Sequence, residues 1–218
     1  MRYLHVYTLS LLFVLSTSCG QSQTTSSEDS TRSEAQNPAP FYGSNERGIH
    51  SKYGYADSAG KRLIIQNSLP RGASYTDPDG KKYMYAVFWT RIINETANPV
   101  EATIAFPADT FEIPSSPGVY MKLLLPSDTM TPDKNAIYDY GLAMKSFLDK
   151  HRNQPASLKR TIHPKSSSAF YVVALSTRGT AGILRTEFSL RGQELFYRIN
   201  DKEIPCGRIN LKNLKLLE

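Results

Sequence analysis

Cysteine is scarce in this sequence: its 218 residues include only Cys19 and Cys206. Two cysteines cannot build the disulfide framework that stabilises many small exported domains, so the fold must depend on an apolar core. We interpret Cys206 as a small buried hydrophobic residue. A catalytic thiol is the less favoured alternative, because no histidine lies near Cys206 in the sequence.

Catalytic, metal-binding and nucleotide-binding motifs are also missing. After the first 18 residues the histidines are His50, His151 and His163, and none belongs to a His-x-His or His-Glu-x-x-His pattern. No Gly-x-Ser-x-Gly sequence marks a nucleophile elbow. A Ser-His-Asp triad whose members meet only in the folded chain stays open. We therefore assign no catalytic, cofactor-binding or metal-binding residue and expect no cofactor.

Charge is not concentrated in any segment. The net charge is +6, and the lysines and arginines are scattered along the chain. A nucleic-acid-binding protein requires a dense basic stripe, so we expect no nucleic acid partner. Asp77, Asp79 and Gly80 have the spacing that begins a calcium loop. A hairpin turn is favoured instead, because Lys81 and Lys82 follow and would repel a cation.

No stretch of the sequence is apolar over the roughly 20 residues that a membrane-spanning helix requires. A shorter apolar run covers residues 9–15, after the basic residue Arg2 and before the small residues at 16–18. This order is typical of a secretory signal, so we expect residues 1–18 to be removed.

The end of this signal resembles the lipobox of bacterial lipoproteins, on the residues Leu15-Ser16-Thr17-Ser18-Cys19-Gly20. It departs from the commonest form, in which leucine lies three places before the cysteine, because Leu15 is one place earlier. The resemblance implies that Cys19 is acylated and anchors the chain in membrane lipid. Each buried methylene group contributes about 0.8 kcal/mol, so two or three acyl chains hold firmly. Ordinary secretion with an unmodified Cys19 is the alternative.

The chain divides into three parts. After the signal peptide at 1–18, residues 19–40 are rich in Ser, Thr, Gln and Glu and almost free of apolar side chains. Such a segment cannot offset its ordering entropy, so we expect a flexible lipidated tether. Residues 41–218 suffice for a single domain with its own core. Gly20 stands where aspartate would hold a lipoprotein at the inner membrane, which implies the outer membrane.

Apolar periodicity predicts that residues 41–218 are mainly β. Residues 82–94 are apolar on both faces, which predicts a central strand. Residues 100–106 alternate, and the short polar link between the two runs predicts a hairpin. Further strands are expected at 61–67, 119–125, 169–175, 182–190 and 195–200.

One helix is expected at residues 133–151, where apolar side chains recur at helical spacing. Thr131 is a candidate N-cap, and Pro132 suits the first helical position. Gly141 weakens the middle of the segment, so two shorter helices are the alternative. Strands at this spacing with one helical insertion predict an all-β fold, an immunoglobulin-like antiparallel β-sandwich.

Aromatic residues are abundant, with 13 tyrosines and 9 phenylalanines. Tyr53, Tyr55 and Tyr75 lie in sequence that looks like loop. Because tyrosine combines an apolar ring with a polar tip, these three form a candidate binding surface. The alternative is that they pack against a sheet, as most aromatic residues in β proteins do.

These observations favour a lipoprotein of the bacterial cell envelope with a non-enzymatic binding or accessory role. Its partner would be an envelope protein or a glycan, and its location the outer membrane. One alternative is an envelope hydrolase that acts on glycan or peptide through a dispersed catalytic site. Another is a purely structural envelope component.

Overall fold

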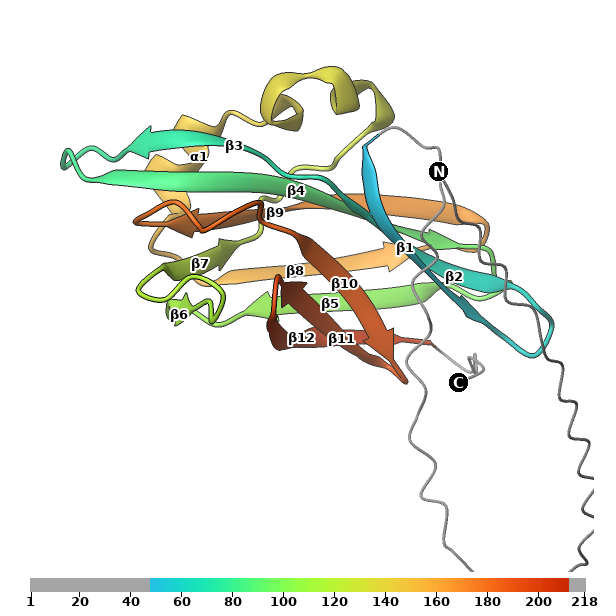
Figure 1. Ribbon diagram of the computed structural model, residues 1–218. Coiled ribbons are helices and arrows are strands. Elements are labelled where there is room, and N and C mark those ends of the chain that lie inside the picture. Colours follow the sequence, from blue (N-terminus) through green and yellow to red (C-terminus); the bar gives the residue numbers. More distant parts are fainter. Residues whose placement is uncertain (1–47, 212–218) are drawn as a thin grey trace, which may run out of the picture. The chain divides into compact units, whose positions relative to one another are not determined.

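The structure is a computed structural model that describes residues 48–211 (Figure 1). More than half of these residues lie in strands, which pair antiparallel in two sheets. The expected all-β class is confirmed. Residues 1–47, with the predicted signal, Cys19 and the tether, and residues 212–218 lie outside the described part. No helix within 48–211 has the length and apolar character needed to cross a membrane.

The larger sheet is arranged around one long strand. Its strand order is β1-β2-β4-β9-β7-β6, and β3 pairs with β4 as well. The strands are β1 (Ile49–Ala56), β2 (Arg62–Ser68), β3 (Arg71–Thr76), β4 (Lys82–Asn94), β6 (Phe111–Glu112), β7 (Tyr120–Leu124) and β9 (Ser166–Ser176). β4 pairs with β9 on one side and with β2 and β3 on the other, so the predicted central strand is confirmed.

The smaller sheet has five strands in the order β10-β11-β12-β5-β8. They are β5 (Val100–Phe106), β8 (Ala156–Ile162), β10 (Thr186–Arg191), β11 (Glu194–Ile199) and β12 (Lys202–Asn210). Alternate side chains of β5 are buried, as its sequence predicts. An apolar layer lies between the two sheets, and within it the rings of Phe170 and Phe188 meet edge to face at 5.5 Å.

The opposite face of the larger sheet is covered by a helical segment (Figure 1). The segment contains two 3₁₀ turns, η1 (Pro132–Ala136) and η2 (Tyr138–Gly141), and the helix α1 (Met144–His151). Met144 and Leu148 belong to the same apolar cluster as Val173 and Leu175 of β9. β9 is therefore buried on both faces, which explains its continuous apolar sequence.

The prediction of a continuous helix over 133–151 is wrong in its first half. Asp139, Tyr140 and Gly141 all have positive φ angles, which no α-helix accommodates. Thr131 makes no capping bond with its side chain, although Pro132 does occupy the start of η1. The backbone turns there because the Asp139 carboxylate accepts a hydrogen bond of 2.5 Å from the Tyr85 hydroxyl.

The predicted hairpin between residues 82–94 and 100–106 is also wrong, because β4 and β5 belong to different sheets. Asn94 fixes the crossing between them. Its Nδ2 group donates to the carbonyl oxygens of Asn98 (2.8 Å) and Ile162 (3.1 Å). Its Oδ1 atom accepts from the hydroxyl of Thr96 at 2.7 Å. The link thus bonds to the end of β8 and not across a hairpin.

The favoured hairpin turn at Asp77–Gly80 is confirmed. The Oδ1 atom of Asp77 accepts hydrogen bonds from the backbone N–H groups of Asp79 (3.0 Å) and Lys81 (2.8 Å). The turn joins β3 to β4, and Gly72 lets these two strands approach each other. A Cβ atom at Gly72 would lie 2.1 Å from the carbonyl oxygen of Tyr85.

Asn67 connects the two sheets where β2 passes the end strand β10. Its Oδ1 atom accepts from the N–H of Phe188 at 2.9 Å and from the hydroxyl of Thr90 at 3.1 Å. Its Nδ2 group donates to the carbonyl oxygen of Phe188 and to the Oγ atom of Ser51, each at 3.2 Å. Nearby, the Tyr55 hydroxyl accepts from the N–H of Leu190 at 2.7 Å. These side chains bond the outer edge of β10, which no strand of the described part pairs.

Replacing Asn67 by alanine should lower the free energy of unfolding by about 3 kcal/mol, because it leaves buried backbone groups of Phe188 without partners. Urea unfolding of the purified protein measures the change. Asn153→Ala, at an exposed position, is the matched control and should stay within about 0.5 kcal/mol of the wild type. Equal stabilities of the two variants would contradict the role assigned to Asn67.

Candidate functional site

The structure places the three candidate binding tyrosines in strands and not in loops. Tyr53 and Tyr55 lie in β1, Tyr75 lies in β3, and all three are only 5–6% exposed. Tyr53 and Tyr55 pack in the layer between the sheets, whereas Tyr75 packs under the helical segment. The prediction of loops is wrong, and the rings belong to the core.

Each of the three hydroxyls has a structural partner. The Tyr75 hydroxyl donates to Asp149 of α1 at 2.7 Å, which ties the helix to β3. Burial raises the pKa of Tyr55 to about 12, so its hydroxyl stays neutral where it accepts the bond from Leu190. The Tyr53 hydroxyl donates to the carboxylate of Glu187.

Glu187 is the centre of a buried polar network between β1 and the smaller sheet. Its side chain is 7% exposed. Its Oε1 atom lies 3.4 Å from the Nε2 atom of His50, and its Oε2 atom contacts Tyr53 and Arg198. These are the residue types of acid–base chemistry. Both carboxylate oxygens are nevertheless engaged, and the network holds β1 against β10.

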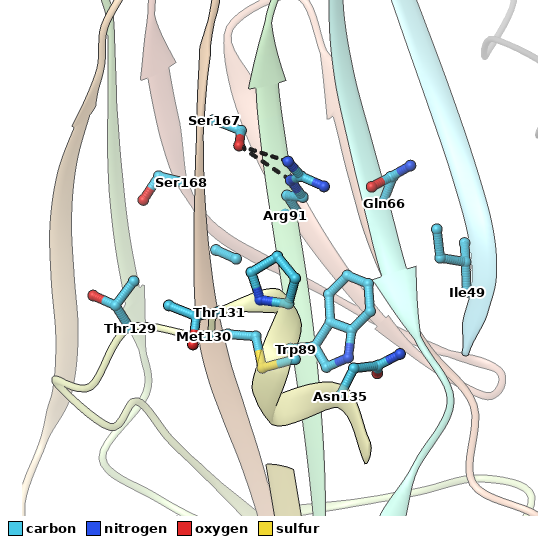
Figure 2. A pocket seen from close by; sticks show the side chains of 12 residues that line it. Ile49, Gln66, Trp89, Arg91, Thr129, Met130, Thr131, Asn135, Ser167 and Ser168 are labelled. Atoms are coloured by element: carbon cyan, nitrogen blue, oxygen red, sulfur yellow. Dashed lines mark hydrogen bonds between the residues drawn. The ribbon is translucent and has the colours of Figure 1, made fainter. Parts of the chain in front are cut away.

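A pocket of about 390 Å³ lies on the face of the larger sheet that the helical segment covers (Figure 2). Arg91 of β4 stands in the sheet between Gln66 of β2 and Ala169 of β9, its two cross-strand neighbours. The full lining is Ile49, Gln66, Trp89, Arg91, Thr129, Met130, Thr131, Pro132, Asn135, Ser167, Ser168 and Ala169.

The pocket exists because residues 129–135 cross the sheet beside β9. Thr129 forms a bridge with Phe170, and the N–H of Met130 donates to the carbonyl oxygen of Ala169 at 3.2 Å. Pro132 then starts η1 and turns the chain. Trp89 and Arg91 are two residues apart on β4, so both side chains face this segment.

One end of the pocket carries the positive charge of Arg91. The Nε and Nη2 atoms of Arg91 donate to the Oγ atom of Ser167 at 3.1 and 3.0 Å (Figure 2). No carboxylate within residues 48–211 pairs with this guanidinium. The charge is therefore available to a ligand.

The other end of the pocket contains Trp89 and Met130 (Figure 2), and Pro132 also belongs to the lining. The Nε1 atom of Trp89 is buried and has no hydrogen-bond partner in the described part of the chain. An unsatisfied buried donor costs about 1–3 kcal/mol, so native proteins seldom leave one without a purpose.

The remaining residues considered from the sequence are not brought together. His50 belongs to the Glu187 network, His151 stacks on Phe147, and His163 lies in the turn between β8 and β9. Within residues 48–211, no three His, Cys, Asp or Glu side chains form a metal-binding group. Cys206 is buried, as interpreted, and burial raises the pKa of its thiol. The thiolate needed for catalysis is thus disfavoured.

The sequence did not identify the pocket, because its lining comes from five separate segments. One signal was present: Arg91 is the only charged residue in the apolar run 83–93 of the central strand. A charge in a strand that is buried on both faces needs a local reason. Searches against known protein families, curated proteins and solved structures find no match to this chain.

The Glu187 network should make stability depend on pH through His50. Burial lowers the pKa of His50, while Glu187 raises it and Arg185 and Arg198 lower it. The unfolded chain, with a histidine pKa of about 6.5, therefore binds a proton more readily than the folded one. This contribution to stability is present above about pH 6.5 and is lost as the pH falls through the folded pKa.

His50→Gln should reduce the loss of unfolding free energy between about pH 7.5 and about pH 5.5. Chemical denaturation at the two pH values measures it. His163→Gln, at an exposed position, should keep the wild-type dependence. An unchanged pH dependence in His50→Gln would show that His50 is not the titrating group.

Proposed function

We propose that this protein is a lipid-anchored protein of the bacterial envelope that binds a protein segment or a glycan without transforming it. The observation that carries the proposal is the pocket around Arg91 and Trp89. It combines an available charge and an unsatisfied N–H donor with apolar contacts, and such a combination recognises a ligand.

The chemistry of the lining supports binding over catalysis. The twelve lining residues include no His, Cys, Asp or Glu, so no side chain there is suited to accept a proton at neutral pH. The serine and threonine hydroxyls would need such a base to become nucleophiles. The groups present are those that orient a ligand by hydrogen bonds.

The sequence around Cys19 supports the location. Acyl chains on Cys19 would hold the tether 19–40 at the membrane, and Gly20 favours the outer one. The tether would let the β domain reach partners near the surface. We also propose an immunoglobulin-like sandwich as the description of this domain, which is supported by antiparallel pairing and by the apolar layer that the two sheets share.

Cys19→Ser should abolish the incorporation of radiolabelled palmitate and release the protein from the membrane fraction, because the mature chain would carry no acyl group. Cys206→Ala is the control, since it removes the other cysteine and should leave labelling intact. Palmitate incorporation into neither the wild type nor the control would refute the anchor.

Thr129→Trp should block the pocket, because Thr129 is exposed and lines it. Capture from solubilised membranes with the tagged full-length protein should then lose the envelope protein or glycan that the wild type retains. Thr161→Trp, on an exposed position of β8, is the control and should retain it. Capture of the same partners by both variants would rule out the pocket as the binding site.

A further inference from the structure

We propose that the ligand of the pocket is an acidic sugar whose carboxylate or phosphate group binds Arg91. This inference rests on the proposed binding function and names the chemistry of the ligand. Three features support it: the state of Arg91, the excess of neutral polar side chains in the lining, and the apolar contacts around Trp89.

Arg91 differs from the arginines that form ion pairs within the fold. Arg62, Arg152 and Arg191 each pair with a carboxylate. The hydrogen bonds of Arg91 run from its Nε and Nη2 atoms to the one hydroxyl of Ser167, which leaves the Nη1 side open. A guanidinium presents its N–H groups as a planar fork that fits two oxygens of a carboxylate or phosphate. Ser167 holds the fork in place for such a group.

The lining contains no acidic side chain that could neutralise Arg91. The pocket is therefore electrically positive, and the net charge of +6 for the whole chain favours the approach of an anion. A neutral ligand would leave a partly dehydrated positive charge without compensation. The charge thus selects for an anionic group.

The neutral polar groups indicate that the rest of the ligand is rich in hydroxyls. Side chains that can donate or accept hydrogen bonds outnumber the purely apolar ones in the lining, although apolar atoms provide the larger share of its exposed surface. These side chains are Gln66, Trp89, Thr129, Thr131, Asn135, Ser167 and Ser168. Apolar acids such as fatty acids cannot use these groups.

The apolar contacts suit the C–H face of a sugar ring. Trp89 and Met130 lie on the side of the pocket away from Arg91 (Figure 2), and Pro132 also lines it. Aromatic and apolar side chains with a polar edge bind groups that are part apolar and part polar. At about 390 Å³ the cavity is near the lower limit of small-molecule sites, so it holds one or two sugar units.

The single tryptophan of the chain makes the test specific. Because that residue is Trp89, intrinsic fluorescence of the full-length protein in detergent reports on the pocket itself. The probes are D-glucuronate, D-glucose 6-phosphate, D-glucose and benzoate, and calorimetry supplies the dissociation constants. Glucuronate or glucose 6-phosphate should bind at least about tenfold more tightly than glucose, with a change in Trp89 fluorescence. The two anions distinguish a carboxylate from a phosphate, and benzoate tests the need for hydroxyls.

Arg91→Gln should remove the preference for the acidic sugar and weaken its binding at least about tenfold. Arg208→Gln changes the net charge equally at an exposed position on β12 and should bind as the wild type does. Equal binding of glucose and both anions, tighter binding of benzoate, or a preference that survives Arg91→Gln would overturn the proposal. The absence of binding by every sugar would overturn it too.

Failure of this inference can be told apart from failure of the proposed function. If no acidic sugar is preferred but Thr129→Trp still prevents capture of an envelope partner, the pocket binds a different chemistry and the binding function stands. If Thr129→Trp leaves capture unchanged, the proposed function itself fails.

Discussion

The arrangement of the two sheets depends on the carboxamide of Asn67. It is buried between β2 and β10 and uses both of its ends, which bond the N–H and the carbonyl group of Phe188. An edge strand presents backbone groups that must be satisfied once they leave water. Side chains from the other sheet satisfy them here, which fixes the distance and the register between the sheets. Next to this contact, Tyr53 of β1, the strand that pairs with β2, donates to Glu187, which directly precedes Phe188 on β10.

The smaller sheet packs on one face of the larger sheet, and a short helical segment covers the other face. Within this segment, residues of η2 and α1 pack against the central strands β4 and β9. The segment runs beside the sheet at residues 129–135 and leaves a gap over Arg91. The pocket is thus the place where the helical cover is incomplete, and the charge of Arg91 is tolerated in a central strand because it reaches that gap.

Local pattern predicted β2, β4, β5, β7, β9, β10 and β11, because side-chain alternation is a local property, but it did not predict β3, β6, β8 or β12. β4 and β5 begin and end at the predicted residues. Their pairing could not be predicted, since alternation does not reveal which sheet a strand joins, and the bonds of Asn94 reach residues nearly 70 positions away. β1 was missed because its glycine, serine and lysine hide the alternation of Tyr53 and Tyr55. The pocket could not be predicted either, because the residues that line it are distant from one another in the sequence. The isolated charge of Arg91 in an apolar strand was the one local signal.

The polar groups of the described core fall into two kinds, and the difference separates structure from function. The carboxamide of Asn67 and the carboxylate of Glu187 have partners on every oxygen and use them to hold strands together. Two residues of the pocket lining differ: the indole N–H of buried Trp89 has no partner in the described part of the chain, and the partly exposed guanidinium of Arg91 bonds only the hydroxyl of Ser167. A buried atom without a partner does not by itself mark a binding site, because Asp139 Oδ1, which does not line the pocket, also lacks one in the described part of the chain. The distinguishing group is Arg91, whose charge is partly exposed to the cavity and has no carboxylate beside it there, so an anionic ligand would supply the partner that the lining does not.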